Sequence, residues 1–283
     1  MTDWFSGDVQ TNGIKMHYYR TGGDKPPLVL SHGATDDGLC WTRVARDLES
    51  DFDVIMPDAR GHGLSDAPEQ GYSSAEHAAD LAGLIRALGL ERPAVGGHSM
   101  GAATTLRLVA EEPTIARCAI LEDPPLWAGE GPVVAPGRES PRDGIRRMVE
   151  EAQTSGREAV IARGRAASPS WADEEFAPWA EAKMRVSSHF TNELRLPRGQ
   201  EWRTLLPLVT CPLLLVTSDP ERGGIVTPET SDAAAQLQPG LRVVRLSGAG
   251  HNIRREQFEA FVGAVRDFLG APAAVGGRAS ATE

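Results

Sequence analysis

The sequence predicts a doubly wound α/β domain, in which helices cover both faces of a mostly parallel sheet. Two observations carry this prediction. Short, continuous apolar runs recur along the chain, and such runs are typical of strands that are buried on both faces. Helical patterns separate the runs, so strand and helix alternate, as they do in a parallel sheet with crossover helices.

The expected strands begin with a hairpin. Asn12-Gly13, a pair that tolerates the positive φ of a tight turn, joins a run at 9–11 to a run at 14–19. Further strands are expected at 27–31, 52–57, 94–97, 118–121, 212–217 and 241–246. Helices are expected at 74–88, 100–111 and 257–269, where apolar residues recur at helical spacing.

One long stretch lacks any strand pattern. Between Leu126 and Leu206 a loop rich in Pro and Gly leads into helical patterns. We therefore expect a helical cap at 128–206, inserted into a core formed by 1–127 and 207–270. Residues 271–283 are small, polar and rich in Gly and Ala, a composition that predicts a disordered tail.

Composition excludes several classes of partner. A formal net charge of −10 argues against a nucleic-acid partner, which requires a basic surface. The three cysteines are far apart, with no Cys/His cluster, so neither a disulfide framework nor a metal site is expected. Without a signal-peptide pattern or an apolar run approaching a bilayer's width, we expect no membrane partner and a cytoplasmic location. Nothing in the sequence indicates an organic cofactor.

The strongest chemical signal is Gly97-His98-Ser99-Met100-Gly101. This G-x-S-x-G pattern lies between an expected strand and an expected helix, the context in which a tight turn exposes a serine nucleophile. A serine nucleophile needs a base. Of the seven histidines, only His251 follows the last expected strand, where a loop at the carboxyl edge of the sheet can deliver an imidazole to Ser99.

From these residues the chain is identified as resembling the α/β-hydrolase family over residues 9–269. Four segments carry the resemblance: His32-Gly33-Ala34-Thr35, Asp58-Ala59-Arg60-Gly61-His62-Gly63-Leu64-Ser65, the serine turn, and Gly248-Ala249-Gly250-His251-Asn252. The resemblance implies an eight-stranded, mostly parallel sheet and a helical lid after the sixth strand. It also implies an oxyanion hole formed by the backbone N–H groups of Ala34 and Met100.

Three carboxylates compete for the role of the acid that orients His251. Alignment of the expected strand at 212–217 with the family pattern favours Glu221, with Asp219 a close rival. Asp123 follows the strand at 118–121, where some lid-bearing relatives carry their acid. We rank Glu221 first, Asp123 second and Asp219 third.

The expected function is hydrolysis of a carboxylic ester or lactone through an acyl-enzyme, using Ser99, His251 and one of these acids. Tryptophans in the cap suggest a small apolar or aromatic substrate, although packing within the cap explains them equally well. Two alternatives stay open. One is carbon–carbon bond hydrolysis of a diketone, for which Asp36, Asp37 or His98 could supply an extra polar group. The other is a non-enzymatic ligand-binding receptor.

Overall fold

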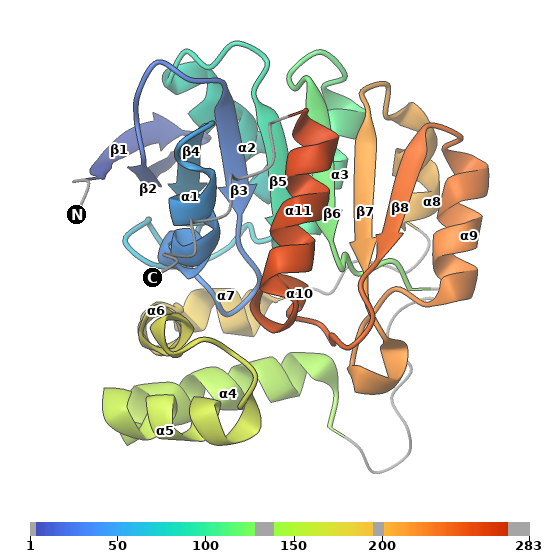
Figure 1. Ribbon diagram of the computed structural model, residues 1–283. Coiled ribbons are helices and arrows are strands. Elements are labelled where there is room, and N and C mark those ends of the chain that lie inside the picture. The colour runs from blue at the N-terminus through green and yellow to red at the C-terminus, as the bar shows by residue number, and fades with distance from the viewer. Residues whose placement is uncertain (1–3, 128–138, 195–200, 271–283) are drawn as a thin grey trace, which may run out of the picture.

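The computed structural model describes residues 4–127, 139–194 and 201–270, which form an eight-stranded sheet covered by helices (Figure 1). The strands are β1 (Phe5–Thr11), β2 (Ile14–Arg20), β3 (Pro27–Ser31), β4 (Asp53–Pro57), β5 (Ala94–His98), β6 (Cys118–Glu122), β7 (Leu213–Thr217) and β8 (Leu241–Arg245). Their order in the sheet is β1-β2-β4-β3-β5-β6-β7-β8. Both neighbours of β2 are antiparallel to it and all other pairs are parallel. The predicted mostly parallel sheet is confirmed.

The first and last strands show where local patterns succeed and fail. Asn12 and Gly13 adopt φ values of 44° and 79°, so the predicted tight turn joins β1 to β2. By contrast, β8 is not buried on both faces, and Val243 is 37% exposed. Because β8 pairs only with β7, it is an edge strand, and edge strands keep more contact with solvent.

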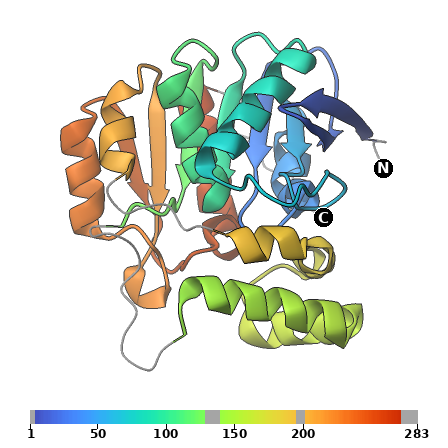
Figure 2. The ribbon, with the colours of Figure 1, turned by 180° about the vertical axis from the view of Figure 1, so that it is seen from behind.

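Helices cover both faces of the sheet (Figures 1 and 2). One face carries α1 (Thr42–Leu48), α10 (Ile253–Glu256) and α11 (Phe258–Leu269), and the other carries α2 (Ser74–Ala87), α3 (Met100–Glu111), α8 (Glu201–Leu205) and α9 (Pro228–Leu237). Side chains of a strand alternate between the two hydrophobic cores. In β4, for example, Val54 and Met56 join the core beneath α1 and α11, whereas Ile55 joins the core beneath α2 and α3.

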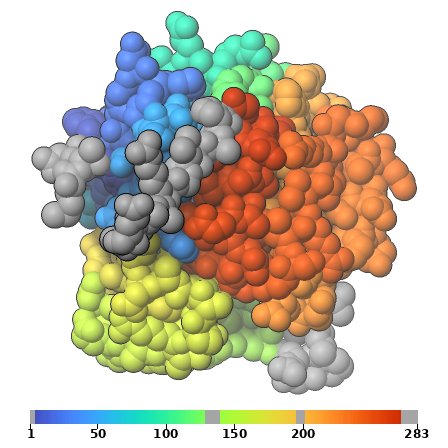
Figure 3. Space-filling model, viewed as in Figure 1, coloured from blue at the N-terminus to red at the C-terminus, as the bar shows by residue number. Residues whose placement is uncertain are grey.

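Four further helices lie together beyond the carboxyl ends of the central strands (Figures 1 and 3). These cap helices, which follow β6 in the chain, are α4 (Pro141–Ser155), α5 (Arg157–Ala167), α6 (Phe176–Arg185) and α7 (Ser188–Glu193). Their own small core includes Trp171, Phe176 and Val160. Trp202 of α8, within the predicted cap range, instead packs in the core beneath α3. The boundaries of the cap stay a prediction, and the predicted tail at 271–283 lies outside the described residues.

None of the helices in the described part of the chain is both long and apolar enough to span a bilayer.

Candidate active site

Ser99 occupies a strained turn between β5 and α3. Its φ of 53° and ψ of −113° place a non-glycine residue in a rarely populated region. The flanking glycines are required by close backbone contacts. A Cβ on Gly97 would lie 2.3 Å from the carbonyl of Gly101, and a Cβ on Gly101 would lie 2.2 Å from the carbonyl oxygen of Ser31. The predicted G-x-S-x-G turn therefore has a direct steric explanation.

His251 lies beside Asp123, the residue that directly follows β6. The distance from His251 Nδ1 to Asp123 Oδ2 is 2.6 Å, and the Asp123 side chain is fully buried. The backbone N–H groups of Ile225 and Val226 also donate to the Asp123 carboxylate, over distances of 2.9–3.1 Å. The two backbone N–H groups thus fix the position of the Asp123 carboxylate, and the carboxylate fixes the orientation of the His251 ring.

This geometry corrects the ranking of the acids, because Glu221 is exposed in the short turn Pro220–Arg222. Asp219 is engaged elsewhere, since its carboxylate accepts the Gly248 N–H at 2.7 Å and pairs with Arg245 at 3.0 Å. The loop at 223–226 turns back over Asp123 and supplies N–H donors rather than the acid. Asp123, the second-ranked candidate, is the carboxylate beside His251.

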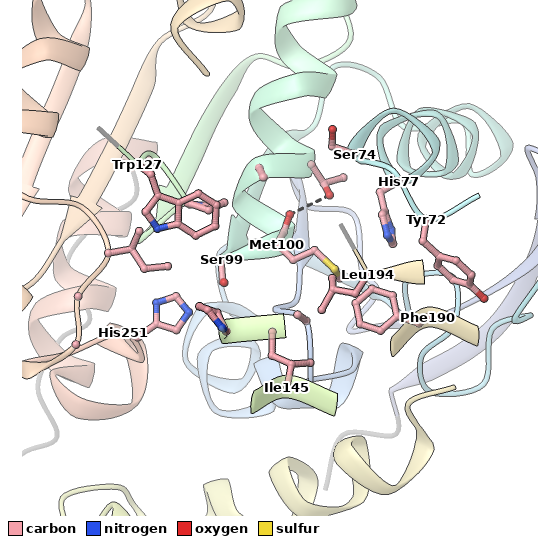
Figure 4. A pocket seen from close by; sticks show the side chains of 18 residues that line it. Tyr72, Ser74, His77, Ser99, Met100, Trp127, Ile145, Phe190, Leu194 and His251 are labelled. Carbon is pink, nitrogen blue, oxygen red and sulfur yellow. Dashed lines mark hydrogen bonds between the residues drawn. The ribbon is translucent and has the colours of Figure 1, made fainter. Parts of the chain in front are cut away.

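Ser99 and His251 face one cavity of about 510 Å³ (Figure 4). Ala34 and Met100, the residues predicted to form the oxyanion hole, line it as well. Met100 is the first residue of α3, and the N–H groups of a helix's first turn have no intrahelical acceptor. Cap helices α4 and α7 contribute Ile145 and Phe190 to the wall, and Leu194, which follows α7, lines it as well.

His98 fixes the backbone of the His251 loop. Its Nε2 lies 2.8 Å from the carbonyl oxygen of His251, so this nitrogen carries the proton and donates. Burial lowers the pKa of His98 well below its ordinary value, which keeps the imidazole neutral and leaves Nδ1 unprotonated. No sequence pattern indicated this role. His98 acts through His251. The three residues considered as extra polar groups for diketone hydrolysis, His98, Asp36 and Asp37, do not line the cavity.

A second feature that the sequence did not reveal is a buried ion cluster behind the site. Its six members are each no more than 4% exposed: Asp36, Glu122, Glu175, Lys183, Arg254 and Arg255. Asp36 is central, with Arg254 at 2.9 Å, Arg255 at 3.1 Å and Lys183 at 3.6 Å. Glu122 pairs with Arg254, and Glu175 pairs with Arg255. Three acids thus balance three bases.

The ion cluster joins three segments of the site to the cap. Asp36 lies two residues after Ala34, Glu122 directly precedes Asp123, and Arg254 follows His251 by three residues. Lys183 belongs to cap helix α6. Burial by itself would raise the pKa of Asp36, but Arg255, Lys183 and Arg254 hold it well below its ordinary value. Burial lowers the pKa of Lys183 to about 8.

Asp36→Asn should destabilise the protein strongly, because the substitution leaves buried cations without their central anion. Breaking a buried pair in this way costs about 3–5 kcal/mol. For a chain of this size that loss lowers the melting temperature by on the order of 10 °C, as measured by circular dichroism.

Lys183→Met is the matched control. It keeps both arginine contacts of Asp36 and exchanges the most distant of its three cations for an apolar chain of similar length. We expect a much smaller fall in melting temperature. Equal losses in the two variants would show that Asp36 does not hold the cluster together.

Within the described residues, no group of three or more His, Cys, Asp and Glu side chains is placed to hold a metal ion.

Comparison with known proteins agrees with this geometry. The family described as alpha/beta hydrolase fold matches residues 26–254. An N-formylmaleamate deformylase of Pseudomonas putida is 32% identical, over 94% of this chain and 97% of its own. The crystal structure of an N-formylmaleamic acid deformylase from Pseudomonas putida S16 superposes with a TM-score of 0.78 at 27% identity, covering 92% of this chain and all of that one.

An enol-lactonase structure from Burkholderia xenovorans LB400 matches with a TM-score of 0.72 and 25% identity, over 93% of this chain and all of its own. These relatives are thus named as two deformylases and an enol-lactonase. The family match spans most of the chain, and the first relative exceeds 30% identity over nearly its whole length. The protein therefore belongs to the α/β hydrolase fold family and is related to hydrolases along almost its entire sequence.

Proposed function

We propose that this protein is a serine hydrolase that cleaves a carboxylic ester or lactone through an acyl-enzyme. Ser99 is the nucleophile, His251 the general base and Asp123 the carboxylate that orients His251. The observation that supports this most strongly is the 2.6 Å contact of Asp123 with His251, which lines the same cavity as Ser99. Named relatives that cleave a lactone and a formyl compound belong to the same broad class of acyl transfer to water.

In the acylation step, Ser99 Oγ attacks the carbonyl carbon of the substrate and its proton passes to His251 Nε2. Because Nδ1 donates to Asp123, Nε2 is the nitrogen left with a lone pair to accept this proton. The negative charge that develops on the carbonyl oxygen is met by the N–H groups of Ala34 and Met100. The bond to the leaving oxygen then breaks, and His251 returns the proton to that oxygen.

In the deacylation step, His251 removes a proton from a water molecule, which attacks the acyl carbon. The bond to Ser99 Oγ breaks, and His251 gives the proton back to the serine. The products are a carboxylic acid and an alcohol, or one hydroxy acid when the substrate is a lactone. The cavity volume of about 510 Å³ is typical of sites for small molecules.

The test uses purified protein with p-nitrophenyl acetate, butyrate and phenylacetate, together with simple γ- and δ-lactones followed by pH-stat. We expect steady turnover, and we expect a fluorophosphonate probe to modify Ser99 with loss of fluoride. The proposal fails if the panel is not hydrolysed and the probe leaves Ser99 unmodified.

Hydrolysis of an N-acyl bond is the second candidate, favoured by the 32% identity to a deformylase. The same residues would act, with His251 protonating an amine in place of an alcohol. The matched pair p-nitrophenyl acetate and p-nitroacetanilide separates the two, since acyl group and chromophore are shared. Each enzymatic rate is divided by the spontaneous rate. A larger enhancement on the anilide would favour the N-acyl substrate.

A further inference from the structure

The end of the cavity near α2 and α7 is aromatic and includes a buried histidine. Tyr72, His77 and Phe190 lie together there, and the His77 ring is 6.4 Å from Phe190 and 6.5 Å from Tyr72 between centroids. Figure 4 shows the three side chains grouped on the side of the cavity away from His251.

His77 has unused hydrogen-bonding capacity. Its side chain is only 5% exposed, and Nε2 is buried with no hydrogen-bond partner. Tyr72 differs, because its hydroxyl already donates to the Pro68 carbonyl at 2.6 Å. A buried polar atom without a partner is rare in folded proteins and calls for an explanation such as a ligand.

The charge of His77 limits what it can bind. Burial lowers the pKa of His77 well below its ordinary value, and His62, Arg60 and His32 lower it further, so the imidazole is neutral. A neutral imidazole offers one donor and one acceptor. A hydroxyl group can either donate to Nε2 or accept from it, whereas a carboxylate can only accept and finds no positive charge on this ring.

We propose that His77 is a specificity-determining residue, an inference that rests on the proposed function. It binds an uncharged polar group, such as a hydroxyl, carried by the apolar or aromatic part of the substrate remote from the scissile carbonyl. Among the described residues, the cavity lining contains no Lys, Arg, Asp or Glu. The other polar side chains near this end are engaged, since Thr104 donates to the Met100 carbonyl and Ser74 accepts from Arg107.

Boronic acids provide the test, because boron binds the nucleophilic serine in place of the acyl carbon and its single substituent must fill the cavity. The probes are 2-phenylethyl- and 3-phenylpropylboronic acid, each with hydrogen, hydroxyl or carboxylate at the para position. Inhibition constants are measured against p-nitrophenyl acetate, or as Kd from tryptophan fluorescence, since Trp127 lines the cavity. At one of the two lengths we expect the hydroxyl compound to bind about tenfold more tightly than its parent.

His77→Phe should remove this preference, because the ring volume is kept and the hydrogen bond is lost. His77→Gln, whose amide reaches a position similar to that of Nε2, should retain much of it. His189→Gln, at an exposed histidine outside the cavity lining, should retain all of it. A melting curve for each variant identifies any that fails to fold, and in that case the comparison of the six probes on the unaltered protein decides.

The inference is overturned if wild type binds hydroxyl and parent compounds equally at both lengths, if the carboxylate compound binds best, or if folded His77→Phe keeps the preference. A protein that hydrolyses esters and binds every boronate without discrimination loses only this inference. A protein that neither hydrolyses esters nor binds any boronate loses the proposed function as well.

Discussion

Ser99→Ala should lower ester hydrolysis to less than about a thousandth of the wild-type rate, because only binding and the oxyanion hole remain to accelerate the reaction over its rate in water. The substitution removes only the Oγ that forms the acyl-enzyme. The backbone conformation at position 99 is set by the turn and by the close backbone contacts at Gly97 and Gly101, and the serine hydroxyl takes no part in it. We therefore expect alanine to adopt the same conformation. The rate is measured as p-nitrophenol release at saturating substrate, with protein at high enough concentration to detect slow turnover.

The melting temperature is the control, and it should stay close to that of wild type because no packing atom is lost. Ser231→Ala is the matched control variant, because it removes an exposed hydroxyl on α9, outside the cavity lining. Ser231→Ala should hydrolyse esters at the wild-type rate. Substantial turnover by folded Ser99→Ala would show that another group attacks the substrate.

Local sequence patterns predicted most of the fold because each one reports a short-range constraint. The strand at Pro27–Ser31 and the helix at Met100–Glu111 have the bounds that the apolar runs and the stop at Pro113 predicted. The turn at Asn12-Gly13 needs positive φ, a requirement that is visible in the sequence itself. Burial of β8 was predicted wrongly because edge position depends on strand order, which no local run encodes.

The sequence ranking of the carboxylates differs from their placement beside His251 for the same reason. Counting residues after β7 favours Glu221, but the count assumes that the loop continues in the usual direction. Gly223, with φ of 101°, turns the chain so that Ile225 and Val226 face Asp123. No local pattern predicted the ion cluster either, since its members are spread over the chain from Asp36 to Arg255 and only Arg254 and Arg255 are adjacent. Only the folded chain brings them together.

Asp123→Asn should lower kcat by about 10⁴-fold, the effect of the same change in a serine protease, with little effect on substrate binding. The contacts of Asp123 explain why. Oδ1 is within reach of both backbone donors, Val226 N–H at 3.1 Å and Ile225 N–H at 3.1 Å. The Ile225 N–H is shared with Oδ2 at 2.9 Å, and Oδ2 also lies 2.6 Å from His251 Nδ1. An asparagine has one carbonyl oxygen, which the two backbone donors will hold, so its NH₂ group faces His251. Nδ1 must then accept, and the proton moves to Nε2.

With a proton on Nε2, His251 cannot accept the proton of Ser99, and acylation stops although every residue is in place. Glu221→Gln and Asp219→Asn are the matched controls, because each removes one negative charge from the same side of the site. Glu221 is exposed and Asp219 pairs with Arg245, so both variants should keep kcat within about tenfold of wild type. If Glu221→Gln were inactive and Asp123→Asn active, the acid would be Glu221, in the loop after β7, and the 2.6 Å contact between Asp123 and His251 would not be the catalytic one.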